Sequence, residues 1–331
     1  MRILNGTEMW NAVTLTEVMD AVEDAYAIHK SGRYTMPDRF CAARGGDLML
    51  YMPCFLDSFI GTKMLAEFPD NPKKGFPYLS GLMILNEAET GQPAAVMDGG
   101  TLTAMRTGAV SGVALRYLAP EACTSAGLVG CGTQGLHQLL YACAVRPLTD
   151  LYLYDLHVPD PGPFCDRLRE KLHACGINRG IRFHFCRDAR SLAEQSEILI
   201  SATQATDPVY PDDEALLKGK CLIAIGSWKP DRRELPDAVW KLCRFAYTEL
   251  PYACEESGDL AIPLASGLLS PDRVRYMEDL IQDTKEGRPH EQADTRCFKS
   301  VGMGIFDARC AQLICEKARQ KRIGAEIAWD S

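Results

Sequence analysis

The chain has 331 residues, of which 47% are hydrophobic and 24% are charged, and its formal net charge is −8. These values are typical of a globular enzyme with two domains. The sequence contains no basic tract and no apolar run of about 18 residues, so we expect no nucleic-acid partner and no association with a membrane. Because the N-terminus lacks the apolar core of a secretory signal, we expect a cytoplasmic protein.

Fourteen cysteines are dispersed along the chain, and none forms a C-x-x-C pair. Zinc needs clustered ligands and the six histidines are also scattered, so we predict no metal site. Most cysteines lie in apolar segments, where reduced thiols act as small hydrophobic side chains. Cys131 is the exception, because a predicted helix N-terminus beside it would stabilise a thiolate. We still favour a spectator role for this thiol.

The N-terminal third is predicted to form a helix followed by a sheet. Thr14 and Glu17 form a capping box, and Gly32 ends the helix that begins there. Apolar runs then predict strands within a β-rich region, at residues 59–65, 81–86 and 94–97. Residues 68–78 contain three prolines and a glycine and are predicted to form a loop. These segments together indicate a mixed or antiparallel sheet.

The middle of the chain is predicted to form a doubly wound α/β domain. A helix at 101–118 is rich in small residues and is ended by Pro120. From residue 122 to about 295, strands and helices alternate. The predicted strands are 126–129, 151–154, 181–185, 198–201, 222–225 and 245–248. Three prolines between 159 and 163 predict an extended loop, and residues 304–320 have the periodicity of a final helix.

A complete G-x-G-x-x-G motif at Gly130, Gly132 and Gly135 lies between a short apolar strand and the helical segment 136–145. The first glycine would permit a tight turn, the second would let the main chain approach a pyrophosphate, and the third would let the helix pack on the sheet. Asp155 ends the next strand, 20 positions after Gly135, where a carboxylate would accept hydrogen bonds from a ribose and repel a 2′-phosphate. This order of elements predicts dinucleotide binding, with NAD favoured and NADP possible. The alternative is that the glycines only make a turn and Asp155 is a solvated strand end.

Other motifs extend along nearly the whole chain. They are G-T-K at 61–63, N-P-K at 71–73, G-F-P at 75–77, T-G-Q-P at 90–93, M-D-G at 97–99, L-T-A-M-R-T at 102–107, G-S-W-K-P-D-R-R-E-L at 226–235, E-S-G-D-L at 256–260 and F-K-S-V-G at 298–302. In these motifs the chain resembles the ornithine cyclodeaminase/mu-crystallin family. The resemblance implies a doubly wound Rossmann domain at 120–300, inserted into an α+β domain made of 1–119 and 301–331. That second domain would carry substrate contacts and the sheet of a homodimer.

The resemblance also implies roles for single residues. Arg39 and Lys63 match residues that hold the substrate carboxylate, and a guanidinium fork suits a carboxylate. Arg106 matches a contact to the cofactor phosphates. The remaining matches are Thr133, Gln134 and Gly135 for the pyrophosphate, Ser201, Ala202 and Thr203 for the adenosine and ribose, and Ser300 and Val301 for the segment over the nicotinamide. Tyr78 replaces a threonine that contacts the cofactor in some members.

Each of the three cations also has a structural interpretation. Arg39 would be a surface arginine after a turn, Lys63 a lysine whose amine reaches solvent, and Arg106 part of a structural ion pair.

One position departs from the cyclodeaminases of this family. They carry an aspartate where this chain has Trp228, and a lysine where it has Arg232. An indole has one N–H donor and cannot act as a base, so we expect this chain not to cyclise ornithine. Trp228 would instead either form the floor of a pocket for an apolar side chain or simply pack.

Three functions remain open after these observations. The preferred one is an NAD-dependent oxidoreductase that moves a hydride at a C–N bond of an amino acid or imine. The second is an ornithine cyclodeaminase-type lyase that eliminates ammonia and recycles its NAD. The third is an accessory or ligand-binding subunit without turnover. Net production or consumption of NADH separates the first from the second.

Overall fold

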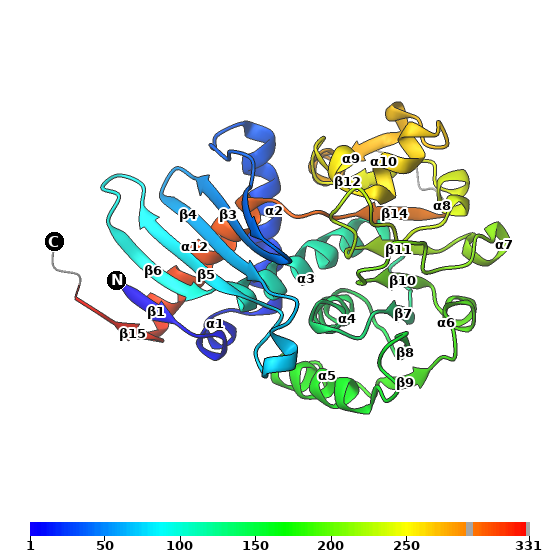
Figure 1. Ribbon diagram of the computed structural model, residues 1–331, viewed down its shortest axis with the longest axis horizontal. Helices are drawn as coiled ribbons and strands as arrows, with labels where there is room; N and C mark the ends of the chain where they lie inside the picture. Colours follow the sequence, from blue (N-terminus) through cyan, green and yellow to red (C-terminus); the bar gives the residue numbers. More distant parts are fainter. Residues whose placement is uncertain (289–293, 329–331) are drawn as a thin grey trace. The chain divides into compact units, whose positions relative to one another are not determined.

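The computed structural model describes residues 1–288 and 294–328 and divides into two compact units. Unit 1 comprises Met1–Arg106 and Met303–Ser331, and unit 2 comprises Thr107–Gly302. The two ends of the chain, blue and red in Figure 1, therefore belong to the same unit. This is the predicted architecture, a Rossmann domain inserted into an α+β domain.

The boundary between the units falls inside helix α3 (Gly99–Leu118), not after residue 119 as the sequence predicted. The second half of α3 is fastened to unit 2. Gln138 Nε2 donates a hydrogen bond to Thr107 O at 3.3 Å, and Arg146 Nη2 donates to Leu115 O and Ala119 O, each at 2.6 Å. A backbone fixed by these bonds belongs with the unit that supplies the donors.

Unit 1 contains a seven-stranded sheet in the order β15-β1-β6-β5-β4-β3-β2. Its strands β2 to β6 form an antiparallel meander, as predicted. The bounds are β1 (Arg2–Leu4), β2 (Phe40–Arg44), β3 (Asp47–Phe55), β4 (Phe59–Glu67), β5 (Leu79–Glu87), β6 (Pro93–Asp98) and β15 (Ala325–Glu326). The predicted loop at 68–78 contains one short 3₁₀ turn, η1 (Pro72–Lys74).

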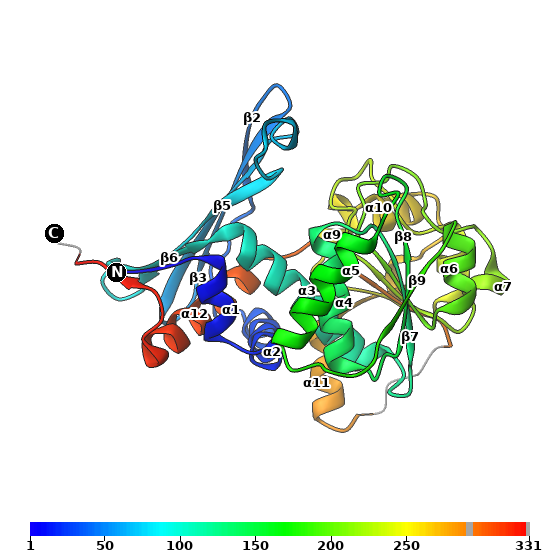
Figure 2. The ribbon, with the colours of Figure 1, turned by 90° about the horizontal axis from the view of Figure 1, so that it is seen from below.

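Helices α1 (Gly6–Ala12), α2 (Leu15–Ser31) and α12 (Gly304–Lys321) cover one side of this sheet (Figure 2). The predicted capping box begins α2, since Thr14 accepts from the Glu17 amide, and Gly32 ends the helix with φ 70°. The predicted final helix is α12. The short α1 and β1 before residue 13 were not predicted.

Unit 2 contains an eight-stranded parallel sheet in the order β13-β12-β14-β11-β10-β7-β8-β9. The bounds are β7 (Ser125–Val129), β8 (Asp150–Tyr154), β9 (Arg182–Phe185), β10 (Ile198–Ser201), β11 (Cys221–Ala224), β12 (Ala246–Thr248), β13 (Val274–Tyr276) and β14 (Arg296–Lys299). The chain runs outward from β7 to β9 and then resumes on the other side of β7 at β10. Ligands bind beyond the carboxyl ends of the strands at such a reversal.

The helices of unit 2 lie on both faces of its sheet. Figure 2 shows α4 and α5 on one side and α6 on the other. The bounds are α4 (Thr133–Val145), α5 (Gly162–Ala174), α6 (Ala189–Gln195), α7 (Glu214–Leu217), α8 (Asp237–Leu242), α9 (Ala253–Glu256), α10 (Gly258–Ala265), η2 (Pro271–Arg273) and α11 (Met277–Lys285).

All six strands predicted for the middle of the chain are present, but two features were missed. Strands β13 and β14 were not predicted, because charged residues (Arg275, Arg296 and Lys299) interrupt their apolar pattern. The predicted proline-rich extended loop ends early, because α5 begins at Gly162 with Pro163 in its first turn. A proline is tolerated there, since its missing N–H would have no partner within the helix.

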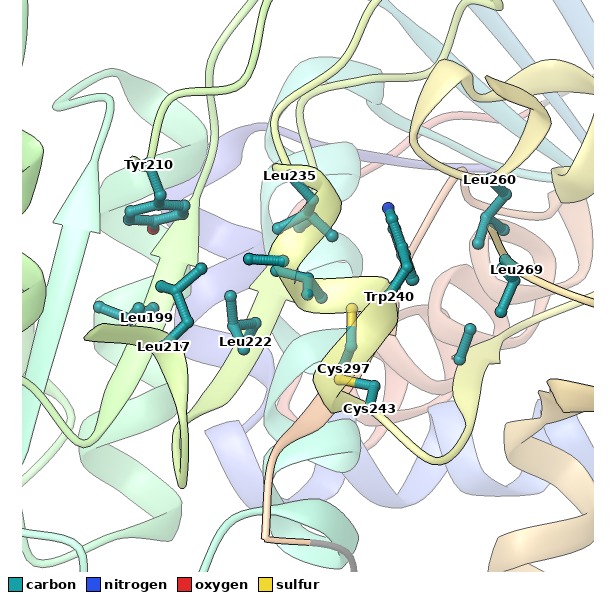
Figure 3. Packing of buried hydrophobic residues seen from close by; sticks show 14 of the residues in the cluster. Leu199, Tyr210, Leu217, Leu222, Leu235, Trp240, Cys243, Leu260, Leu269 and Cys297 are labelled. Atoms are coloured by element: carbon teal, nitrogen blue, oxygen red, sulfur yellow. The ribbon is translucent and has the colours of Figure 1, made fainter. Parts of the chain in front are cut away.

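The hydrophobic core of unit 2 fixes the strands from one face. Figure 3 shows Trp240 of α8 within this core, with Cys243 against Cys297 of β14. Trp240 is fully buried, as are Leu199 and Leu222 of the neighbouring strands β10 and β11. This packing positions the strand ends at which the loops of the candidate site begin.

Candidate functional site

Each glycine of the G-x-G-x-x-G motif has a distinct geometric role. Gly130 has φ 102°, and a Cβ there would lie 2.7 Å from Ala202 O. A Cβ on Gly135 would lie 2.1 Å from Gly130 O, so only glycine lets α4 start this close to the turn. A Cβ on Gly132 would meet no described heavy atom within 4 Å, which leaves space outside the main chain.

The N-terminus of α4 has no cap of its own. Its N-cap residue is Gly132, without a side-chain hydrogen bond, and its first turn has no acidic residue. Elsewhere in unit 2, α6 is capped by Asp188 and α7 by Asp213, whereas α5 and α8 also lack a side-chain cap. Unpaired amides and the positive end of a helix dipole are the features that bind phosphate groups.

Two buried oxygen atoms beside this turn have no hydrogen-bond partner within residues 1–288 and 294–328. They are Gln134 Oε1 in the first turn of α4 and Ser201 Oγ at the carboxyl end of β10. Buried polar atoms are usually paired, so both atoms fit a ligand that carries hydroxyl or amide groups.

Asp155 follows β8 and lies against the glycine turn. Its Oδ2 accepts from Cys131 N at 2.7 Å, and its Oδ1 accepts from His157 N at 2.8 Å and Val158 N at 3.1 Å. An ionised carboxylate has about four acceptor positions, so one remains for a ribose hydroxyl. The carboxylate of Asp155 thus lies at the end of β8, as the sequence predicted, and it also holds the glycine turn through Cys131 N.

The thiol of Cys131 has the spectator role that we favoured, and the helix N-terminus does not stabilise it as a thiolate. Burial, and secondarily the negative charge of Asp155, raises the pKa of Cys131 to about 12. The thiol therefore stays protonated at neutral pH and does not act as a nucleophile.

Buried acids hold the other loops at the carboxyl ends of the strands. Glu234 accepts from Thr203 N at 2.7 Å, from Thr203 Oγ1 at 2.8 Å and from Gly226 N at 2.7 Å. Burial raises the pKa of Glu234. The predicted site residue Thr203 is thus fixed in place by an acid that the sequence reading did not single out.

A second acid, Glu249, holds the segment after β14. It accepts from Ser300 Oγ, from Val301 N at 2.9 Å and from Gly302 N at 2.8 Å. A third, Asp259, accepts from Glu234 N and Leu235 N, each at 2.8 Å, and its Oδ2 lies 3.3 Å from Lys299 Nζ. These buried carboxylates stabilise irregular loops whose amides would otherwise be unpaired.

Unit 1 places a lysine in the middle of its sheet. Lys63 lies on β4, opposite Met52 of β3 and Met83 of β5, and its side chain is fully buried. Its Nζ lies 2.7 Å from Asp307 Oδ2, and Arg106 Nε donates to Asp307 Oδ1 at 2.9 Å. The structure therefore brings the predicted residues Lys63 and Arg106 together around an acid in the first turn of α12. The reading of Lys63 as a lysine that reaches solvent is wrong.

The surroundings of Lys63 disfavour its charged form. Burial is the largest effect, and together with the positive charges of Arg106 and Arg39 it outweighs the attraction of Asp307. The pKa of Lys63 is lowered from 10.5 to about 7. The positive charge of Arg39 thus acts on Lys63, and its contact with a substrate carboxylate stays a prediction. An amine with this pKa exchanges a proton near neutral pH.

Among the described residues, no group of histidine, cysteine and acidic side chains is arranged to hold a metal ion. No described helix combines the length and apolar character needed to cross a membrane.

The family model described as the ornithine cyclodeaminase/mu-crystallin family matches residues 2–322. The chain belongs to this family.

Three relatives align over almost the full length of this member of the ornithine cyclodeaminase/mu-crystallin family. The alanine dehydrogenase of Archaeoglobus fulgidus is 30% identical, over 99% of this chain and 98% of the relative. The Thermococcus litoralis Delta(1)-pyrroline-2-carboxylate reductase in complex with NADH and L-proline is 30% identical, with a TM-score of 0.86, and covers 99% of this chain and 100% of its own. An archaeal alanine dehydrogenase dimer with bound NAD is 27% identical, with a TM-score of 0.84, and covers 100% of this chain and 99% of its own.

In this family member, the loop after β11 carries Trp228, at the position where the resemblance implies an aspartate in cyclodeaminases. The Trp228 ring is half-buried, and Lys229 Nζ lies 4.7 Å from its centroid. Arg232 fastens the same loop, because its guanidinium donates to Gln204 O and its carbonyl accepts from Ser227 Oγ. In unit 1, Tyr78 Oη donates to Glu67 Oε2 at 3.3 Å. The assignment of Tyr78, Trp228, Arg232 and Val301 to one substrate pocket stays a prediction.

Proposed function

We propose that this chain is an NAD-dependent oxidoreductase that moves a hydride to or from the α-carbon of an amino acid or its imine. The observation that carries the proposal is the buried Lys63, whose pKa is lowered to about 7, in a chain whose other unit contains a complete G-x-G-x-x-G turn. The two kinds of relative, an amino-acid dehydrogenase and an imine reductase, catalyse reactions of this class and support it.

Unit 2 would hold the dinucleotide. The uncapped first turn of α4, with Thr133, Gln134 and Gly135, would bind the pyrophosphate through main-chain amides. Gly130 and Gly132 would shape the turn, and Asp155 would bind the adenosine ribose, which favours NAD without excluding NADP. Ser201 and Thr203 would line the adenosine side, and Ser300, held by Glu249, the nicotinamide side. Arg106 retains guanidinium donors beyond Nε, and these would reach the phosphates.

Unit 1 would hold the substrate. Arg39 and Lys63 would bind its carboxylate, because a guanidinium and an ammonium are the natural partners of that group. A bound nicotinamide supplies or accepts the hydride. In the reductive direction, Lys63 would give its proton to the imine nitrogen, so that one hydride and one proton convert the C=N bond to an amine. In the oxidative direction, neutral Lys63 would take that proton back.

The test is a panel of substrates supplied with NADH or NADPH and followed at the nicotinamide absorbance band. The panel contains 2-oxo acids with ammonia, 2-oxo acids with methylamine, cyclic imine carboxylates and ornithine. We expect NADH consumption with at least one oxo acid–amine pair or cyclic imine. Conversion of ornithine to proline and ammonia without net change in NADH would instead establish the lyase. Tight NADH binding with no turnover of any member would establish an accessory subunit.

We further propose that the protein is a homodimer formed through the outer face of the unit 1 sheet, the face turned away from α12. On this face Phe40, Phe55 and Leu82 are 64%, 47% and 44% exposed. Met64 pairs with both Tyr51 and Leu82 across neighbouring strands, so the apolar surface is continuous. The occupant we propose is a second copy of this chain, and the dimer of the related alanine dehydrogenase supports it.

The cysteines support a reducing compartment. All fourteen are free thiols, and most are buried. We therefore keep the cytoplasm as the proposed location.

A further inference from the structure

Two cationic side chains of unit 1 share one carboxylate, and a third acts on the lysine of this pair. Asp307 contacts Lys63 and Arg106 directly, and Arg39 influences the same lysine. Arginine stays protonated under all physiological conditions, whereas a buried lysine with a lowered pKa does not. The protonation of Lys63 therefore depends on how strongly the carboxylate of Asp307 interacts with Lys63 and how strongly with Arg106.

We propose that Asp307 is a positioning residue that sets the protonation state of Lys63 by sharing its carboxylate between Lys63 and Arg106. This inference rests on the proposed function and deepens it, because it names the group that prepares the proton donor.

The geometry leaves Asp307 little freedom. Its two oxygens are used separately, Oδ2 by Lys63 Nζ at 2.7 Å and Oδ1 by Arg106 Nε at 2.9 Å. Its side chain is 1% exposed, so water does not replace either partner. It lies in the first turn of α12, where the helix dipole favours an anion.

The same arrangement explains why the lysine is not simply a permanent cation. Arg106 competes with Lys63 for the carboxylate of Asp307 and repels the Lys63 ammonium. Burial further disfavours the charged form of Lys63. Among the residues that the structure describes, the thiols of Cys54 on β3 and Cys310 on α12 also interact with Asp307. Burial raises the pKa of each thiol to about 12, so both stay neutral at the pH of interest. The charges that set the pKa of Lys63 are therefore those of Asp307, Arg106 and Arg39.

Two variants should move the protonation of Lys63 in opposite directions. Asp307→Asn removes the anion, so Lys63 should lose its proton at a pH lower by about one unit or more. Arg106→Gln removes the competing cation, so Lys63 should keep its proton to a pH higher by about one unit. The readout is the pH at which kcat/KM for imine reduction falls by half, near 7 in the unchanged protein. If Asp307→Asn does not fold, Arg106→Gln still tests the inference. Loss of activity in the variants without any movement of this midpoint would overturn it.

Unfolding measurements provide a readout that needs no activity. Between the lowered folded pKa and the ordinary pKa of the unfolded lysine, the unfolded chain binds more protons, so this group makes stability rise with pH. In urea titrations from pH 5 to 10, that rise should begin near pH 7 in the unchanged protein. It should begin lower in Asp307→Asn and higher in Arg106→Gln, and be absent in Lys63→Met. Identical pH dependence in all four proteins would overturn the inference. If the rise shifts as expected while no imine is reduced, the inference about protonation stands and the proposed function fails.

Discussion

A lysine in the centre of a sheet is costly to bury, and its neighbours show how the fold tolerates it. Lys63 is fully buried between two methionine-bearing strands, and its amine is held by Asp307. A buried amine paired in this way can change protonation near pH 7, which a solvent-exposed lysine does not do. At the scale of single residues, the proposed chemistry therefore depends on Lys63.

Replacing Lys63 by methionine should remove proton donation while keeping the volume and the dinucleotide site. We expect kcat for imine reduction to fall by about 10²–10⁴-fold, the usual contribution of a general acid. The dissociation constant for NADH, measured by fluorescence titration, should change less than about threefold. Lys63→Arg is the matched control, because it keeps the positive charge but cannot release a proton near neutral pH. It should retain more substrate affinity than Lys63→Met and show the same loss of kcat. Full activity in Lys63→Arg would contradict the role.

Asp155 is expected to select the cofactor. Replacement by asparagine keeps an acceptor for Cys131 N but removes the charge that repels a 2′-phosphate. The ratio of kcat/KM for NADH to that for NADPH should fall by about tenfold or more, which corresponds to about 1.4 kcal/mol. Asp155→Ala should relax selectivity too and also destabilise the turn, because Cys131 N loses its partner. An unchanged ratio in Asp155→Asn would mean that the acid does not contact the ribose.

At the scale of elements, the strand–turn–helix unit of β7 and α4 is the part that local sequence described best. The glycines, the strand before them and the helix after them all lie where the spacing predicted. Local signals suffice there because the turn needs particular φ values and close packing that only glycine allows. The buried acids that fix the neighbouring loops escaped notice. Glu234, for example, bonds Thr203 from 31 positions away, and no local pattern marks such a pair.

The glycine turn gives a matched pair of variants. Gly135→Ala would place a Cβ 2.1 Å from Gly130 O, whereas Gly132→Ala meets no described atom within 4 Å. We expect Gly135→Ala to lower the free energy of unfolding by about 1–3 kcal/mol, because the backbone must shift to relieve the overlap. The free energy of unfolding of Gly132→Ala should lie within about 0.5 kcal/mol of that of the unchanged protein. This variant should nevertheless bind NADH at least about tenfold more weakly. Thermal unfolding and isothermal titration calorimetry measure the two effects. Unchanged NADH affinity in Gly132→Ala would show that no pyrophosphate approaches this position.

In unit 1 the sequence predicted the cations of the site but not the acid that they surround, again because that acid is distant in sequence. Lys63, Arg39 and Arg106 were found through motifs, but Asp307 was not, because it pairs with Lys63 across 244 positions of the sequence. The one available signal was an acid within the apolar run of 305–308 at the start of a predicted helix. Burial of such an acid implies a cationic partner, although the sequence alone does not say which.

At the scale of the whole molecule, the chain returns to its first unit after completing the second. The resemblance to the family implied this insertion, whereas the place of the boundary within α3 depends on long-range bonds from Gln138 and Arg146. The apolar outer face of the unit 1 sheet also exists only once its strands have paired. Its apolar side chains come from several strands, and alternation along each strand turns them all to one side.

A charge on this outer face should prevent dimerisation. Leu82→Glu places a carboxylate at a residue that is 44% exposed in the single chain, so the fold should tolerate it. In a dimer the same carboxylate would be buried without a partner, at a cost of several kcal/mol. Light scattering coupled to size-exclusion chromatography should give a dimer for the unchanged protein and a monomer for Leu82→Glu. Glu89→Gln, in the turn between β5 and β6, is the control and should stay dimeric. A dimeric Leu82→Glu protein would place the interface elsewhere.

The central claim is that this protein transfers a hydride between a nicotinamide cofactor and the α-carbon of an amino acid. Its most direct test is a reduction run with NADH carrying deuterium at C4, in separate reactions for the two faces of the ring. The substrate is any imine or oxo acid–amine pair turned over in the panel, and the product is analysed by mass spectrometry. The account predicts one deuterium at the α-carbon from one of the two labelled forms and none from the other. Product without deuterium from either form would contradict it.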